Sequence, residues 1–245
     1  MKQSIFTLEH SRQLTDDTYE LVLSGDTSAI TAPGQFVEIE LPGKFLRRPI
    51  SVCNWSANGL LLLVKVLGDG TRELVRSVPG TELDVLSGLG NGFDLTLGGS
   101  NPALVGGGIG IAPLYGLAQR MLAYGKHPTV VLGFRTAADA FYLEEFAALG
   151  CNLQIATEDG SMGIKGFVTD AIQALPDCHY VFSCGPLPML QAVDGLEQLT
   201  GGQFSFEARM GCGFGACMGC SVPVKGGMKR VCKDGPILYK EEIVW

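Results

Sequence analysis

The sequence is poor in charged residues and has no overall excess of positive charge. Only 18% of its 245 residues are Asp, Glu, Lys or Arg, and the formal net charge is −7. Basic residues outnumber acidic ones only in the last segment, residues 201–245. Nucleic-acid binders need a basic surface to meet the phosphate backbone, so we do not expect this acidic chain to bind DNA or RNA.

Signals for export and for membrane insertion are also missing. The first residues, MKQSIFTLE, contain neither an apolar core of about 7 to 15 residues nor a small-residue cleavage site. The longest uncharged run, residues 95–119, is interrupted by glycines and by Pro102 and Pro113. Such a run is not expected to cross a bilayer as a helix. Because no export signal is found, we expect a cytoplasmic protein. Because 46% of the residues are apolar, we expect the chain to fold.

The first segment, residues 1–98, has the pattern of short β-strands. Apolar residues recur at every second position over residues 19–23 and 37–41, and a further apolar run covers residues 60–66. Pro-Gly and Asn-Gly pairs separate these runs. The pattern predicts an antiparallel sheet that closes into a β-barrel, with one helical stretch near residues 72–78.

The second segment, residues 99–205, alternates between strand and helix patterns. We expect strands over residues 103–105, 129–134, 152–157 and 180–183. We expect helices near residues 112–123, 138–149, 167–174 and 187–199. This alternation is typical of a doubly wound α/β domain, in which helices cover both faces of a parallel sheet.

In the last segment, residues 206–245, regular periodicity disappears from Gly211 onward and cysteines concentrate. Eight cysteines in a chain without an export signal argue against disulfides, because cytosolic thiols are kept reduced. Four of them have the spacing C-x4-C-x2-C-x11-C: Cys212, Cys217, Cys220 and Cys232. The C-x4-C-x2-C part matches the loop around a plant-type [2Fe-2S] cluster, whose fourth ligand lies further along the chain.

The residues around these cysteines suit an iron-sulfur cluster. Glycines in the loop allow positive φ angles and let backbone N–H groups point at sulfur. Four basic residues surround the last cysteine and would favour the reduced cluster: Lys225, Lys229, Arg230 and Lys233. From the residues alone a structural zinc site is the alternative, although zinc sites usually use C-x2-C pairs. Cys53, Cys151 and Cys178 lack ligand spacing and are expected to be small buried residues.

A glycine-rich turn follows the strand expected at residues 103–105 and opens the next helix. It reads Val105-Gly106-Gly107-Gly108-Ile109-Gly110-Ile111, and the free N–H groups of a helix start can bind a pyrophosphate. The predicted nucleotide contacts are Gly106, Gly107, Gly108 and Gly110. Close packing of helix on strand without a ligand is the alternative. The nearest acid after the second strand is Asp139, so spacing alone leaves the choice between NAD and NADP open.

A third candidate site lies in the first segment. Leu46-Arg47-Arg48-Pro49-Ile50-Ser51-Val52 places a guanidinium and a hydroxyl three residues apart on an expected strand. An arginine on a solvated strand edge would explain this string equally well. Arg48-Pro49-Ile50-Ser51 nevertheless resembles the R-x-(Y/F/I)-(S/T) flavin motif of the ferredoxin-NADP reductase superfamily. That resemblance implies that the arginine contacts the flavin pyrophosphate and that the hydroxyl contacts the isoalloxazine.

The resemblance extends along nearly the whole chain, with the motifs in the order of that superfamily. Leu63-Val64-Lys65 and Gly68-Asp69-Gly70-Thr71 resemble its second flavin segment, which implies that Gly70 and Thr71 lie at the FAD phosphates. The turn at residues 106–113 resembles its nucleotide turn. Cys184-Gly185-Pro186 resembles its C-G-P signature, which implies that Cys184 lies beside the nicotinamide. A core cysteine at the end of a strand is the alternative.

The C-terminal cysteines narrow the resemblance, because most reductases of the superfamily have no cluster after the nucleotide domain. The chain resembles the electron-transfer subunits of class 1B dihydroorotate dehydrogenases. Three further strings support this: Glu158-Asp159-Gly160-Ser161, Lys165-Gly166-Phe167-Val168-Thr169-Asp170 and Glu207-Ala208-Arg209-Met210. The resemblance implies an FAD-binding β-barrel at residues 1–98, an NAD-binding Rossmann-like domain at 99–205 and a [2Fe-2S] module at 206–245.

The same resemblance implies a partner and a direction of electron flow. The partner would be the FMN-bearing catalytic subunit that oxidises dihydroorotate to orotate in pyrimidine synthesis, with two of each subunit in a heterotetramer. Electrons would pass singly to the cluster, collect on FAD and leave as hydride to NAD, because FAD exchanges one or two electrons. No side chain of this chain is expected to act as a catalytic acid or base.

Two alternatives remain from the sequence. Gamma subunits of sulfhydrogenases, or related NAD(P)H:acceptor reductases, share the cysteines. The small subunit of bifurcating NADH-dependent ferredoxin-NADP oxidoreductases has aspartate in place of the first cluster cysteine, whereas residue 212 here is Cys. A sensor with a purely structural flavin or zinc site would be a colourless or yellow protein that NADH cannot bleach.

Overall fold

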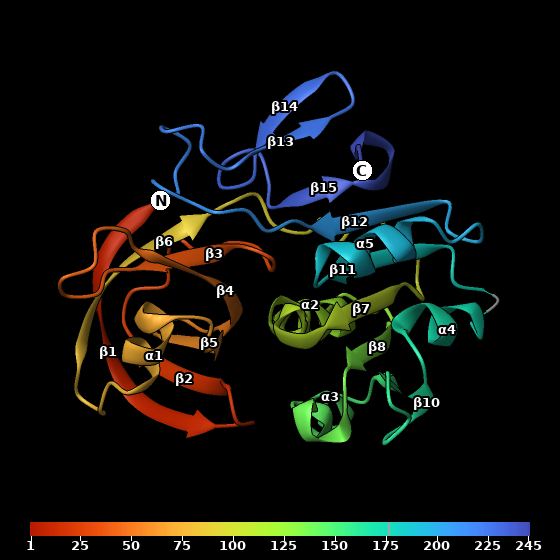
Figure 1. Ribbon diagram of the computed structural model, residues 1–245, viewed down its shortest axis with the longest axis horizontal. Helices are drawn as coiled ribbons and strands as arrows, with labels where there is room; N and C mark the ends of the chain where they lie inside the picture. The colour runs from red at the N-terminus through yellow and green to blue at the C-terminus, as the bar shows by residue number, and fades with distance from the viewer. Residues whose placement is uncertain (176) are drawn as a thin grey trace.

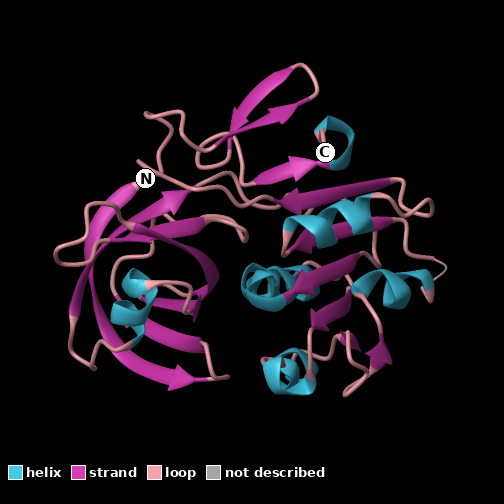
Figure 2. Ribbon diagram, viewed as in Figure 1, coloured by secondary structure: helices cyan, strands magenta, loops and turns pink. Residues whose placement is uncertain are grey.

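The computed structural model describes residues 1–175 and 177–245. An all-β body that contains the N-terminus lies beside an α/β body, and the C-terminal segment runs above both in the view of Figure 1. Strands dominate the first body, whereas helices and strands alternate in the second (Figure 2). The fold class expected from the sequence is confirmed.

The first body is a closed six-stranded antiparallel barrel with the strand order β1-β2-β5-β4-β3-β6. Its strands are β1 (Lys2–Gln13), β2 (Thr18–Ser24), β3 (Phe36–Ile39), β4 (Arg48–Trp55), β5 (Gly59–Lys65) and β6 (Glu82–Leu89). A short helix, α1 (Asp69–Val75), connects β5 to β6. It begins three residues before the position that the sequence pattern indicated.

Alternating side chains explain why these segments form a barrel. Leu21 and Leu23 on β2 and Leu62 on β5 are fully buried. Val22, between the two leucines of β2, and Leu61, before Leu62, are partly exposed. Burying one leucine stabilises the fold by about 2 kcal/mol, so a register shift that exposed them would be costly. Strand β3 differs, because all four of its residues are buried. Its inner face lies in the barrel core and its outer face contacts the C-terminal segment.

The second body is built on a seven-stranded sheet. Its order is β10 (Ile164–Lys165), β9 (Asn152–Thr157), β8 (Thr129–Phe134), β7 (Ala103–Gly107), β11 (Tyr180–Cys184), β12 (Gly201–Ser205) and β15 (Ile237–Tyr239). All pairs are parallel except β12 with β15. The strand order reverses between β7 and β11, and doubly wound sheets bind ligands outside the carboxyl ends of their strands at such a point.

Helices cover both faces of this sheet. Leu104 and Val130 pack on the side of α2 (Ala112–Ala123) and α3 (Leu143–Ala148), whereas Val105 and Val131 pack on the side of α4 (Val168–Gln173) and α5 (Leu187–Asp194). The 3-10 turns η1 (Gly108–Ile111) and η2 (Ala137–Asp139) precede α2 and α3. Helix α5 is shorter than expected because Gly195, a poor helix former, follows Asp194. In the ranges 1–175 and 177–245, no helix is both long enough and apolar enough to cross a membrane.

Short strands form after Gly211, although regular periodicity disappears from the sequence there. Strands β13 (Ser221–Val224) and β14 (Gly227–Arg230) form a hairpin, and β15 extends the edge of the α/β sheet. The 3-10 turn η3 (Lys240–Glu242) follows β15. These strands have only three or four residues, too few for an alternating pattern to be visible in the sequence.

Helix α2 packs against barrel strand β4 and joins the two bodies. Gly116 makes this contact close, because a Cβ at this position would lie 2.5 Å from the carbonyl oxygen of Cys53. One turn later, the guanidinium carbon of Arg120 lies 3.4 Å from the ring centroid of Trp55. The same guanidinium donates to Oδ1 of Asn54 at 3.0 Å. These contacts fix the spacing between the barrel and the sheet.

Replacing Gly116 by alanine should destabilise the protein, although alanine is the better helix former. Helix propensity would gain roughly 1 kcal/mol, but the new Cβ would push α2 away from β4 at a cost of about 1–3 kcal/mol. We expect a lower midpoint of urea unfolding for Gly116→Ala. Gly195→Ala is the matched control, since its Cβ would meet no atom nearer than 3.6 Å. If both variants unfold at the same midpoint, the close contact is not a constraint on the fold.

Candidate functional site

A cavity of about 670 Å³ lies at the carboxyl ends of β7, β8 and β11, where the strand order reverses. Gly107, Gly108 and Gly110 of the glycine-rich turn line it. The turn lies close to β11, because a Cβ on Gly110 would be 2.3 Å from the carbonyl oxygen of Cys184. Glycine therefore lets the helix start approach the strand end, which brings backbone N–H groups to the cavity.

Two residues predicted for this site lie behind its surface. Gly106 is buried next to Ile111, and Cys184 is 2% exposed. Neither is among the described residues that line the cavity. Burial, and then the charge of Glu207, raise the pKa of Cys184 to about 12, so its thiol stays neutral. The place of Cys184 beside a nicotinamide stays a prediction.

The far end of the cavity carries charges of both signs after β8 and β9. Arg135, Asp139 and Glu158 line it there. Oδ2 of Asp139 accepts hydrogen bonds from the backbone N–H and the hydroxyl of Thr136 at 3.1 and 2.9 Å, and Oδ1 lies 3.8 Å from Nη2 of Arg135. The turn after β8 thus brings a carboxylate to the region where NAD-binding folds hold the ribose hydroxyls with an acid.

A second cavity of about 250 Å³ lies between the barrel, the α/β body and the C-terminal segment. Six predicted flavin contacts line its barrel side: Pro49, Ile50, Ser51, Leu63, Lys65 and Thr71. The other side is formed by residues that include Ser205, Phe206, Met210 and Pro236. Four residues line both cavities: Lys65, Ile109, Gly110 and Glu207. The cavities are therefore adjacent, and these four residues form the wall that they share.

Strand alternation separates the predicted residues of β5. Leu63 and Lys65 line the second cavity, whereas Val64 is 1% exposed and belongs to the barrel core. Successive side chains of a strand point to opposite faces. The structure therefore does not bring the Val64 side chain into the predicted flavin site.

Arg48 reaches the start of α1, as a phosphate site there would require. A Cβ on Gly70 would lie 2.0 Å from Nε of Arg48, so glycine is needed for the guanidinium to lie at this place. Oγ1 of Thr71 accepts hydrogen bonds from the N–H groups of Leu67 and Gly68 at 3.0 and 3.2 Å, which fixes the turn into the helix. A guanidinium beside free helix N–H groups is a combination that binds phosphate.

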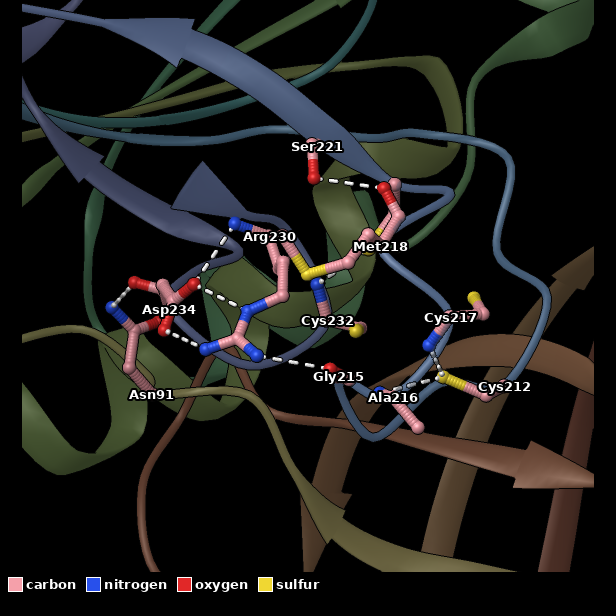
Figure 3. A network of polar contacts seen from close by, with 11 residues as sticks. Asn91, Cys212, Gly215, Ala216, Cys217, Met218, Ser221, Arg230, Cys232 and Asp234 are labelled. Carbon is pink, nitrogen blue, oxygen red and sulfur yellow. Dashed lines mark hydrogen bonds and ion pairs between the residues drawn. The ribbon is translucent and has the colours of Figure 1, made fainter. Parts of the chain in front are cut away.

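The four predicted cluster cysteines lie in the loop before β13 and in the turn after β14. Figure 3 shows three of them, Cys212, Cys217 and Cys232. The N–H groups of Ala216 and Cys217 point at Sγ of Cys212, at 3.2 and 3.4 Å. The N–H group of Cys232 points at Sγ of Cys220 at 3.4 Å. Backbone donors aimed at sulfur are one of the means by which proteins stabilise iron-sulfur clusters.

The thiols are arranged as two pairs. Cys212 interacts through its side chain with Cys217, and Cys232 interacts with Cys220. Among the residues that the structure describes, no three candidate ligand side chains gather around one point. Four cysteine thiolates are the donor set of a [2Fe-2S] cluster, and the C-x4-C-x2-C spacing is the one that wraps such a cluster. The donor set fits a two-iron cluster.

The pKa values of the thiols differ because their surroundings differ. Burial by itself would raise the pKa of Cys212, but the N–H groups of Cys217, Phe214 and Ala216 outweigh it and lower the pKa to about 6. Its thiolate, the form that binds metal, is therefore present at neutral pH. Burial and the neighbouring Cys220 raise the pKa of Cys232 to about 12. Metal binding would release the proton of this thiol.

Sequence reasoning missed two acidic residues at these sites. Glu207 lines both cavities, and burial raises its pKa. Glu38, on the outer face of β3, is 1% exposed, and a Cβ on Gly213 would lie 2.1 Å from its carboxyl carbon. Burial, and then the charge of Cys212, raise the pKa of Glu38 to about 7, although Arg47 acts in the opposite direction. The alternation V-E-I-E indicates a solvent-facing Glu38, so no sequence signal placed it under the cysteine loop.

Glu38→Gln should stabilise the protein above pH 7. The ordinary pKa of the carboxyl is 4.5 and its folded value is about 7, so the folded state binds more protons between these values. Wild-type stability therefore falls as pH rises through this window, by about 1–3 kcal/mol. Urea unfolding at pH 5 and pH 8 should show this loss in the wild type and in the control Glu82→Gln, but not in Glu38→Gln. The same pH dependence in all three proteins would contradict the burial of an ionisable Glu38.

Comparison with known proteins agrees with this geometry. Residues 207–244 match the family model of the iron-sulfur cluster binding domain of dihydroorotate dehydrogenase B, and residues 104–195 match that of the oxidoreductase NAD-binding domain.

The structure of an NADH-dependent reduced ferredoxin-NADP oxidoreductase, studied for flavin-based electron bifurcation, is similar with a TM-score of 0.89 and 32% identity. The match covers 98% of this chain and 89% of that one. The Amycolatopsis cytochrome P450 reductase GcoB shares the fold, with a TM-score of 0.67 and 24% identity over 78% of this chain and 64% of that one.

Full-length relatives give the family. The electron transfer subunit of dihydroorotate dehydrogenase B (NAD(+)) from Listeria monocytogenes serotype 4a is 40% identical in an alignment of 254 positions, which covers 99% of each chain. The subunit of the same name from Bacillus mycoides is 41% identical over 258 residues, which cover 100% of this chain and 99% of that one. With this identity over its whole length, the chain belongs to the family of dihydroorotate dehydrogenase B electron transfer subunits and is an oxidoreductase subunit.

Proposed function

We propose that this chain carries electrons from the FMN of a dihydroorotate dehydrogenase catalytic subunit, through a [2Fe-2S] cluster and FAD, to NAD+ in pyrimidine (UMP) biosynthesis. The observation that carries the proposal is the contact between the three binding regions. The two cavities share four lining residues, and Met210, two residues before Cys212, lines the second cavity. A flavin in that cavity would contact a nicotinamide on one side and lie near the cysteine loop on the other.

Each part of the chain has one cofactor in this proposal. Residues 1–98 bind FAD, residues 99–205 bind NAD and residues 206–245 bind the cluster. The FAD contacts are Arg48, Pro49, Ile50, Ser51, Leu63, Lys65, Gly70 and Thr71. The NAD contacts are Gly107, Gly108 and Gly110, and the iron ligands are Cys212, Cys217, Cys220 and Cys232. Bound FAD supplies the conversion between hydride transfer with the nicotinamide and single-electron transfer with the cluster.

The chain works with a catalytic partner that contains FMN, in a cytoplasmic complex with two copies of each subunit. The relatives named above are electron transfer subunits, and such a subunit needs a partner that oxidises the substrate. Phe214, Met218 and Met228 of the C-terminal segment have 46, 55 and 59% of their surface exposed. Exposed Phe and Met side chains next to a redox centre suit a protein-protein contact.

Cys217→Ser should remove iron without removing FAD. The wild-type chain should contain about two irons and two sulfides, as a four-thiolate [2Fe-2S] site requires. Loss of one thiolate should lower both contents and the visible absorbance of the cluster, while the flavin stays bound in its separate cavity. Cys151→Ser, in a cysteine outside the loop, should keep full iron content. If Cys217→Ser retains its iron, or if the wild type contains zinc in place of iron, the ligand assignment is wrong.

The complete complex should couple dihydroorotate oxidation to NAD+ reduction. NADH formation from dihydroorotate and NAD+ is expected only when this chain and the FMN-containing subunit are mixed, because the chain by itself has the NAD site and not the substrate site. The rate of NADH formation at 340 nm measures this, with each subunit alone as the control. Full dihydroorotate activity of this chain as a free monomer would refute its role as an electron-transfer subunit.

A further inference from the structure

Arg230 connects the two cysteine-bearing stretches of the C-terminal segment (Figure 3). Its Nη1 donates to the carbonyl oxygen of Gly215, inside the cysteine loop, at 2.9 Å. Its Nε and Nη2 donate to the two carboxylate oxygens of Asp234 at 2.8 and 3.0 Å. This two-pronged pairing fixes the plane of the guanidinium, which a lysine could not reproduce. The loop with three of the cysteines is thereby tied to the turn that contains Cys232.

The same turn is attached to the barrel at its other end. Asn91, just after β6, donates its backbone N–H to the carbonyl oxygen of Gly235 at 2.7 Å. Its side chain donates to the carbonyl oxygen of Ile237 at 2.9 Å and accepts the N–H of Ile237 at 3.1 Å. Between these anchored residues lies Pro236, which lines the second cavity. Arg230, Asp234 and Asn91 thus form a continuous connection from the cysteine loop to the wall of the flavin cavity.

Arg230 also lies within electrostatic reach of the cysteines. Its guanidinium, which stays protonated in proteins, lies two residues before Cys232 in the chain and donates to the carbonyl oxygen of Gly215, between Cys212 and Cys217. The guanidinium is therefore a permanent positive charge beside one thiol pair, and its side chain is 24% exposed. Asp234 adds a negative charge directly behind it. Charges and hydrogen bonds around the sulfurs are what set the potential of an iron-sulfur cluster.

We propose that Arg230, held in place by Asp234, is a positioning residue that raises the reduction potential of the cluster and fixes the cysteine loop against the flavin-cavity wall. This inference rests on the proposed function, because it requires a cluster on the four cysteines. A cluster with four thiolates is negatively charged and gains a further negative charge when it accepts one electron. Removing the positive charge of Arg230 therefore disfavours the reduced cluster, and removing the negative charge of Asp234 favours it.

The test is a redox titration of the full-length chain loaded with FAD and iron, with the cluster followed by electron paramagnetic resonance and the flavin by absorbance. Arg230→Gln should shift the cluster to a lower midpoint potential, and Asp234→Asn should shift it to a higher one. Arg230→Lys keeps the charge and should restore most of the potential. Lys225→Gln is the matched control, because it removes an equal charge from an exposed lysine of the same segment. The flavin potential should stay the same in all four variants.

Opposite shifts in Arg230→Gln and Asp234→Asn are the result expected, since a purely structural role would move both variants in the same direction. Shifts of equal sign, or shifts no larger than that of Lys225→Gln, would overturn the inference. If Arg230→Gln fails to retain iron, the direction of the Asp234→Asn shift decides the question, because this variant keeps the Arg230 side chain and its positive charge. A wild-type chain without iron would instead refute the proposed function, so the two failures are distinguishable.

Discussion

The close packing of α2 and the turn before it determines the geometry of the sites. At Gly110 a Cβ would lie 2.3 Å from the end of β11, and at Gly116 it would lie 2.5 Å from β4. One short stretch of chain therefore touches both the sheet and the barrel. The second cavity lies between the barrel, the sheet and the C-terminal segment, and it shares four lining residues with the cavity at the strand ends. Two glycines thus bring the turn that lines both cavities against the sheet and the helix that follows it against the barrel.

The third site depends on the same arrangement, because the C-terminal segment is attached to both bodies. Strand β15 extends the sheet beside β12, and Asn91, just after β6, holds the start of β15 through two hydrogen bonds with the backbone of Ile237. Charge supports this placement. The C-terminal segment is the part of the chain in which basic residues exceed acidic ones, and it holds the four thiols that would carry the negative charge of a cluster. The buried carboxyl group of Glu38, which lies against Gly213, would add a negative charge next to these thiols. This unfavourable charge is consistent with the raised pKa of Glu38.

Local sequence patterns predicted the fold well where side chains alternate or repeat over several turns. Strands β7, β8, β9 and β11 and helix α2 lie where their apolar periodicity indicated, whereas β10, β12 and β15 were not expected. The cysteine spacing indicated a two-iron site that suits the paired thiols. The sequence could not show contacts between distant segments. Glu38, Glu207 and Arg230 acquire their positions only when the barrel, the sheet and the C-terminal segment pack together. Val64 and Cys184 show the converse, because a motif identifies a segment but not the direction of each side chain.

In the proposed function, a flavin in the second cavity exchanges electrons with a cluster on Cys212, Cys217, Cys220 and Cys232. Rapid anaerobic mixing of the loaded chain with NADH, followed by absorbance and electron paramagnetic resonance, tests it most directly. The account predicts that the flavin is reduced first and that the paramagnetic signal of the reduced cluster then appears within the same chain. Complete flavin reduction with a cluster that stays oxidised, although a chemical reductant of the same potential reduces it, would contradict the account.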